Sequence, residues 1–163
     1  ASKDMPYRAR ENFYLEAAHY YDRARQRDKA MTCYKKAATI AKDNGDTQDS
    51  AQAMRKYYRM NQLFPKAMQV KVDEDEIKKE YGKYAHIVLE GIREKSLKVD
   101  PVEFTEGFAE KLQEVMWKVE AAIDKEGDFR TGYQRWQLME QYFDEVNIKW
   151  RNPKLMNLDM MFD

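Results

Sequence analysis

Residues 29–46, with the sequence KAMTCYKKAATIAKDNGD, decide the fold of this chain. Alanine or another apolar residue returns every three or four positions, the spacing that places side chains on one face of an α-helix. Asn44-Gly45 predicts a helix stop, because glycine readily takes the left-handed backbone conformation that ends helices. The stretch therefore predicts a helix from Lys29 to Asp43 whose packing face is made of small residues.

The same periodicity extends outward from this stretch and predicts about six helices. The 6 glycines and 4 prolines in 163 residues favour long helices over many short strands. Capping signals mark several helix starts, among them Asp73 and Asp100-Pro101. The expected helices span residues 7–25, 29–43, 47–64, 73–95, 100–126 and 128–150. The predicted fold is all-α, with an N-terminal helical hairpin packed on a bundle of three longer helices.

Charge divides the chain, although the formal net charge is zero. Residues 1–72 contain 15 Lys and Arg against 8 Asp and Glu, a net charge of +7, whereas residues 73–163 contain 14 against 21. We therefore expect a basic region over 5–72, an acidic helical bundle over 73–152 and an apolar, acidic tail over 153–163, together forming one compact unit. Halves of opposite charge would also allow two copies to associate.

Composition narrows the protein class further. Hydrophobic residues make up 43% of the chain, which supplies a sizeable core, and a mean hydropathy of −0.93 indicates a very polar surface. Cys33 is the single cysteine, so no internal disulfide forms and we expect a reducing, cytoplasmic location. No apolar run approaches the roughly 20 residues that span a bilayer, so we expect no membrane partner.

Residues 11–44 contain a more specific pattern. Tyr34 follows Ala30 by four positions and Ala37 follows three positions later, while Ala18 and Tyr21 occupy the corresponding small and aromatic positions of the preceding helix. This spacing resembles that of the tetratricopeptide repeat, a helix pair of about 34 residues. The segment is similar to the repeats of soluble-attachment-protein adaptors. The resemblance implies that residues 11–44 form one such hairpin.

The resemblance also implies a binding surface, because the first helix of this repeat lines a concave groove that holds a protein partner. The groove-facing positions in this sequence would be Asn12, Leu15, His19, Asp22 and Arg23. Family members that hold a peptide's terminal carboxylate use lysine and asparagine early in this helix. Leu15 and His19 do not form that clamp, so we expect an ordinary helix or an extended peptide as the ligand.

A second candidate surface is basic and interleaved with tyrosines. Guanidinium and ammonium groups neutralise phosphates, and exposed tyrosines stack on unpaired bases, so nucleic acid is an alternative partner. The basic residues of this surface are Arg8, Arg10, Arg25, Arg27, Lys35, Lys36, Arg55, Lys56 and Arg59. Arg23, Arg25 and Arg27 cannot all lie on one helix face, which argues against a continuous phosphate track. Several tyrosines lie on apolar stripes and are equally consistent with a role in the core.

The C-terminal tail is the third candidate. Its apolar residues Leu158, Met161 and Phe162 would be an aggregation liability unless they dock on a surface. The tail resembles the short Leu/Phe-ended peptides by which replication and late-transcription factors bind sliding clamps. A tail folded back onto the chain's own helices is the alternative.

Catalytic patterns are incomplete in this sequence. Glu16 and His19 have the spacing of a di-iron helix motif, but the only other histidine, His86, is preceded three positions earlier by Lys83. There is no glycine-rich phosphate loop and no nucleophile elbow. We therefore expect no enzymatic activity, no metal and no cofactor.

The favoured interpretation is a non-catalytic helical adaptor that binds a protein partner through its basic N-terminal half. The alternative is a nucleic-acid-associated accessory factor, viral or replicative, that contacts phosphates with the basic surface and a protein with the tail.

Overall fold

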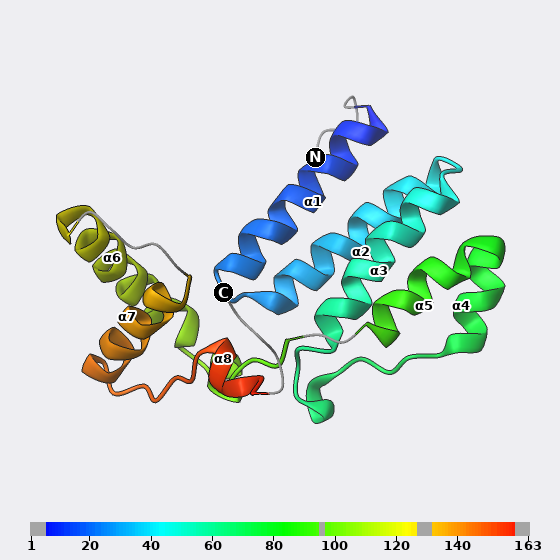
Figure 1. Cartoon of the computed structure of the whole chain (residues 1–163). Helices are drawn as coiled ribbons and strands as arrows, with labels where there is room; N and C mark the ends of the chain where they lie inside the picture. The colour runs from blue at the N-terminus through cyan, green and yellow to red at the C-terminus, as the bar shows by residue number, and fades with distance from the viewer. Residues whose placement is uncertain (1–5, 95–96, 127–131, 159–163) are drawn as a thin grey trace. The chain divides into compact units, whose positions relative to one another are not determined.

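The computed structural model describes residues 6–94, 97–126 and 132–158, and within these ranges it is all-α, without strands (Figure 1). The all-α prediction is thus confirmed. Contacts divide the chain into two compact units, Ala1–Ser96 and Leu97–Asp163. The charge step after residue 72 does not coincide with this division, because residues 74–93 pack within unit 1.

Unit 1 is a row of helices in which spatial neighbours pack against one another. Short connections join the first three helices, so successive helices run antiparallel (Figure 1). Its elements are α1 (Tyr7–Arg23), α2 (Arg27–Asp43), α3 (Thr47–Asn61), η1 (Lys66–Met68), α4 (Glu74–Tyr81), η2 (Gly82–Tyr84) and α5 (Ala85–Arg93). The third helix ends three residues before the expected Phe64.

Small side chains bring the first three helices together. Ala18 of α1 and Ala30 of α2 are fully buried beside Tyr34, whose ring fills the space between these helices. Ala37 is fully buried in a second cluster that includes Ala53 of α3. The alanine spacing therefore produces a closely packed helix row, since these helices meet with little side-chain bulk between them.

In this row α5 lies between α3 and α4, and it packs against α3 at very short range. A side chain added at Gly91 would stand 2.9 Å from the carbonyl carbon of Arg55, closer than real Cβ atoms come. The Gln62 side chain donates a hydrogen bond to the Gly91 carbonyl, and Arg55 pairs with Glu94. Glycine at position 91 is what allows this approach.

The helix expected over 73–95 is interrupted. Asp73 caps its start as predicted, accepting bonds from the backbone N–H groups of Asp75 and Glu76 at 3.1 and 3.2 Å. The chain then turns at Gly82, which has a φ of +54°, and resumes as α5. Tyr81 is buried just before this turn and shares a 3.2 Å hydrogen bond with Ser50 of α3.

Both helices expected after residue 100 are also shorter than predicted. The first becomes a short 3-10 turn, η3 (Pro101–Phe104), followed by α6 (Phe108–Glu126), because Gly107 takes a φ of +84°. The second is α7 (Gly132–Glu145), which ends before Asn147 with a φ of +63°. Asn152, expected to close a helix, instead opens α8 (Pro153–Met156). The described part of unit 2 thus contains two long helices, and the third helix expected in the 73–152 bundle lies in unit 1 as α4 and α5.

Unit 2 has its own core between α6 and α7. Phe108, Leu112, Val115 and Val119 of α6 are buried, and Phe108 stacks on Phe143 of α7 at 5.2 Å between ring centroids. Trp150, expected inside a helix, lies in the irregular segment after α7 and contacts Phe143 at 5.3 Å. The segment after α7 therefore completes the core.

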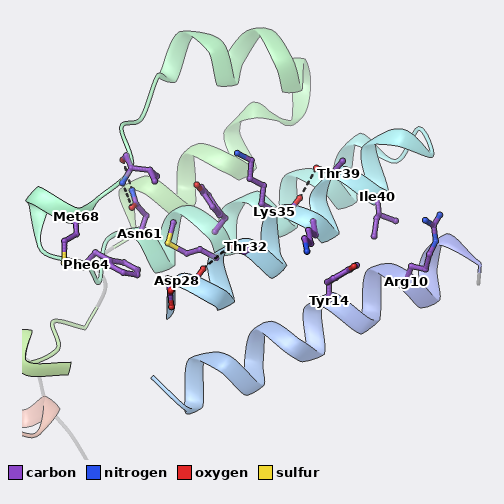
Figure 2. A pocket seen from close by; sticks show the side chains of 14 residues that line it. Arg10, Tyr14, Asp28, Thr32, Lys35, Thr39, Ile40, Asn61, Phe64 and Met68 are labelled. Atoms are coloured by element: carbon purple, nitrogen blue, oxygen red, sulfur yellow. Dashed lines mark hydrogen bonds between the residues drawn. The ribbon is translucent and has the colours of Figure 1, made fainter. Parts of the chain in front are cut away.

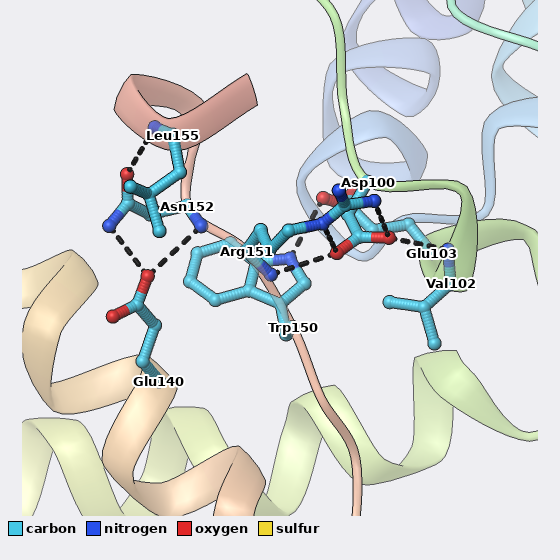
Figure 3. Close-up of polar contacts among 8 residues, drawn as sticks. All are labelled: Asp100, Val102, Glu103, Glu140, Trp150, Arg151, Asn152 and Leu155. Atoms are coloured by element: carbon cyan, nitrogen blue, oxygen red, sulfur yellow. Dashed lines mark hydrogen bonds and ion pairs between the residues drawn. The ribbon is translucent and has the colours of Figure 1, made fainter. Parts of the chain in front are cut away.

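Buried polar groups hold that segment in place (Figure 3). Trp150 donates a 3.0 Å hydrogen bond to Glu103, and Arg151 donates to Asp100 from both its backbone and its side chain, at 2.9 and 3.0 Å. Burial by itself would raise the pKa of Asp100, but these bonds and one from Val102 outweigh it, so the pKa is lowered. Asp100 is therefore held as a carboxylate.

Candidate functional site

A groove on unit 1 is the candidate site. It has a volume of about 790 Å³ and lies along the outer face of α2, between α1 on one side and the end of α3 with the following segment on the other (Figure 2). Figure 2 places Arg10 and Ile40 at one end of the groove and Phe64 and Met68 at the other.

A side-chain clamp builds the wall beyond α3. Asn61 is almost fully buried and binds the backbone of Val70 twice, donating to its carbonyl at 3.1 Å and accepting from its N–H at 2.9 Å. Gln69 donates to the carbonyl of Phe64 at 2.9 Å. These bonds fold the segment after α3 into a wall on which Met68 and Val70 stay exposed, 54% and 41%.

The floor of the groove is the exposed face of α2. Thr32 and Thr39 donate their hydroxyl hydrogens to carbonyls of their own helix, those of Asp28 and Lys35, at 3.2 and 3.0 Å. Such bonds leave the threonine methyl groups as part of the surface offered to a ligand. Tyr57 lies against the core here, and its burial raises the pKa of its hydroxyl above the usual range, so it stays uncharged.

The positively charged residues of the groove lie away from the hydrogen bonds between Asn61 and Val70. Arg10 of α1 and Lys36 of α2 line the groove, and the Lys36 ammonium lies 5.4 Å from the ring centroid of Tyr14. The Nε atom of Arg10 is buried and has no hydrogen-bond partner among the described residues. A buried donor in this condition favours an acceptor supplied by a ligand.

The five positions predicted from the repeat do not line this groove. Asn12, His19 and Arg23 are exposed on α1, and Leu15 packs partly buried against the core. Asp22 instead pairs with Arg27 at 3.3 Å. The groove borders the part of α1 that carries Arg10 and Tyr14, a face on which the repeat alignment placed no ligand contact.

The predicted basic surface is only partly assembled. Three of its residues, Arg10, Lys35 and Lys36, line the groove, and Lys56 is exposed elsewhere on α3. The remaining arginines interact with groups of the chain itself. Those interactions are Arg8 with Asp46, Arg25 with the carbonyl of Arg23, Arg27 with Asp22, and Arg55 and Arg59 with Glu94. The hydrogen bond from Arg55 lowers the pKa of Glu94, as expected for a paired carboxylate.

The apolar wall was not predicted from the sequence. Phe64 was expected at the end of the helix over 47–64, and Met68 and Val70 fall between that helix and the one expected over 73–95, with only Pro65 indicating a change of direction there. Of the tail residues, Leu158 is 79% exposed, while Met161 and Phe162 lie outside the described residues.

The described residues bear on two other types of site, metal centres and membrane-spanning helices, through residue geometry and helix length. No group of three His, Cys, Asp or Glu is placed to hold a metal ion. None of the described helices combines the length and apolar character needed to cross a membrane. No known protein family, curated protein or solved structure matches this chain.

Proposed function

We propose that this protein is a non-catalytic binding module that holds a peptide segment of a protein partner in the groove of unit 1. The observation that supports this most directly is the groove's composition. The apolar wall combines the exposed Met68 and Val70 with the partly buried Phe64, beside a floor that carries Lys35 and Lys36. Sites of this kind, apolar with a few placed polar groups, are typical of ligand recognition.

The resemblance to the tetratricopeptide repeat supports the same class of function. α1 and α2 form a helix pair packed through Ala18, Ala30 and Tyr34, the positions on which the resemblance depends. Repeats of that family present peptides with a groove between helices. Here the groove lies along α2. The resemblance supports peptide binding as the type of interaction, and the lining of the groove supports its location.

Nucleic acid remains the second candidate, since Lys35, Lys36 and Lys56 are exposed on α2 and α3. Against it stand the arginines paired with carboxylates: Arg27 is only 6% exposed beside Asp22, and Arg55 is held by Glu94. A phosphate track needs cations spaced along its whole length. The paired arginines interrupt such a track.

Selection from a library tests the proposal. Random peptides of roughly 12 residues, displayed on phage, are enough to fill a groove of this length in either extended or helical form. They are panned on the immobilised full chain, and the enriched clones are then measured against two variants. Met68→Asp places a charge on the apolar wall, and Phe13→Asp makes the same change outside the groove at a matched exposure of 52% against 54%.

We expect enriched peptides that lose binding to Met68→Asp and keep it with Phe13→Asp, both variants being checked for helix content by circular dichroism. Peptides that bind both variants equally would place recognition outside the groove. Labelled single-stranded DNA and RNA of about 20 nucleotides, titrated at two salt concentrations, form the second arm. Tight, salt-sensitive binding of these probes with no groove-dependent peptide would favour the nucleic-acid function instead.

A further inference from the structure

The two ends of the groove differ in chemistry, and this difference bears on which peptide would fit. One end is apolar, with Phe64, Met68 and Val70. The other carries Arg10 together with Lys36, which stacks near Tyr14. A groove with unlike ends selects both the composition of a ligand and its direction.

The length of the groove follows from α2, which runs along it. Asp28 and Ile40 both line the groove, and at 1.5 Å per residue of helix they stand about 18 Å apart. An extended peptide covers this distance with about five or six residues. The site therefore spans a short linear segment and not a whole protein surface.

Charge is unevenly distributed along that length. Arg10, Lys35 and Lys36 supply three cations, and the one acidic lining residue, Asp28, lies near the apolar wall (Figure 2). An anionic group is therefore attracted to the end with Arg10 and repelled from the end with Asp28. An acidic ligand at the cationic end would also offer an oxygen acceptor near the Arg10 Nε, which is buried without a partner among the described residues.

We propose that the groove binds a short acidic peptide in one direction, with apolar side chains against Phe64, Met68 and Val70 and a carboxylate at Arg10 and Lys36. This rests on the proposed function and specifies the partner: a protein segment with aliphatic or aromatic residues at one end and Asp or Glu a few positions away. The order of the ends excludes a uniformly charged polymer as the best ligand, because half of the groove offers it no counter-charge.

The same peptide selection tests this inference through a different readout. In the enriched sequences we expect Asp or Glu to cluster about three to five positions from the apolar residues, a spacing set by the length of the groove. The two matched variants are Lys36→Glu, inside the groove, and Lys56→Glu, the same charge reversal at an exposed α3 position outside it. Affinity for a selected acidic peptide should fall by about tenfold or more with Lys36→Glu and change by less than about twofold with Lys56→Glu.

The outcomes separate the two proposals. Selected peptides that need Met68 but lack acidic enrichment, and bind Lys36→Glu normally, would overturn the acidic preference while leaving peptide binding intact. An absence of any groove-dependent peptide would remove both. A synthetic peptide copying residues 157–163, which is apolar and acidic, is the competitor. If it displaces the selected peptides at equal concentration, the natural occupant is the tail of another copy, and the proposal of a foreign partner is wrong.

Discussion

Substitution of Gly91 by alanine is the sharpest test of the packing in unit 1. The added methyl group would overlap the carbonyl oxygen of Arg55 and stand 2.9 Å from the carbonyl carbon and α carbon of the same residue. These are backbone atoms of α3, which cannot rotate away as the end of a flexible side chain would. α5 must therefore move outward from α3.

The cost of that movement follows from three contributions. Overpacking in a well-packed core costs about 1–3 kcal/mol, and an obstacle made of backbone atoms places this case near the upper value. Loss of the hydrogen bond from Gln62 to the Gly91 carbonyl adds about 1 kcal/mol. Alanine gains about 1 kcal/mol of helix propensity over glycine, which offsets part of the loss. We expect Gly91→Ala to lower the free energy of unfolding by about 2–3 kcal/mol.

Urea unfolding followed by circular dichroism at 222 nm measures this change. The control is Gly132→Ala at the start of α7, where an added Cβ meets nothing within 4 Å, so stability should stay the same or rise by up to about 1 kcal/mol. If Gly91→Ala unfolds at the same urea concentration as the unmodified protein, or a higher one, the close approach of α5 to α3 is refuted.

Two further predictions concern buried polar groups. Burial, a hydrogen bond to Asp49 and the charge of Asp49 raise the pKa of Glu11 to about 8, so the folded state holds a proton that the unfolded state releases near pH 4.5. The stability that this proton contributes is complete below pH 4.5 and is lost progressively as the pH rises from there through 8. Glu11→Gln should flatten this fall over that pH range and stabilise the protein at pH 7 by about 1–3 kcal/mol. An unchanged pH profile in urea unfolding would contradict the assignment. Asn152→Ala removes the cap of α8 and the side-chain hydrogen bond to Glu140 at one site, so thermal unfolding should show a loss of about 2 kcal/mol. The control Asn147→Gly, at a φ of +63°, should be neutral or stabilising.

The sequence predicts α1, α2 and α3 well, because the apolar periodicity agrees there with the residues that start and end helices. The alanine spacing defines the buried face, and Gly45 ends α2 with a φ of +79°, as its position after Asn44 indicates. Asp46 then caps α3 by accepting a bond from the N–H of Asp49 at 3.0 Å. Local signals of this kind act within one turn of helix and can be identified without knowing the tertiary contacts.

Three helix interruptions were missed because tertiary contacts decide them. Gly82, Gly107 and Asn147 all take a positive φ, yet each stands in a stretch whose apolar periodicity continues on both sides. At Gly82 the turn follows Tyr81, which is anchored by Ser50 on a different helix. A glycine or asparagine permits such a turn, but a partner far away in the sequence determines whether it forms.

The lining of the candidate groove also contains residues that the sequence indicates and residues that only tertiary contacts place there. Arg10, Lys35 and Lys36 were identified from the sequence, since exposed cations on helices are visible in the pattern. The apolar wall was not, because it depends on Asn61 reaching the backbone of Val70, nine residues further along. No periodicity marks a side chain that binds backbone groups across a loop.

The residues that stabilise unit 1 differ from those that line the proposed binding groove. The core depends on buried alanines and on the close contact at Gly91, whereas the groove is lined by side chains such as Lys36 and Met68 that stay exposed. Exposed positions contribute little to the free energy of folding. Gly91→Ala should therefore reduce the folded fraction without changing the affinity of the molecules that remain folded. Met68→Asp and Lys36→Glu should lower the affinity for a peptide without changing the folded fraction. Substitutions in the groove can therefore vary its chemistry while the packing of the helix row stays intact.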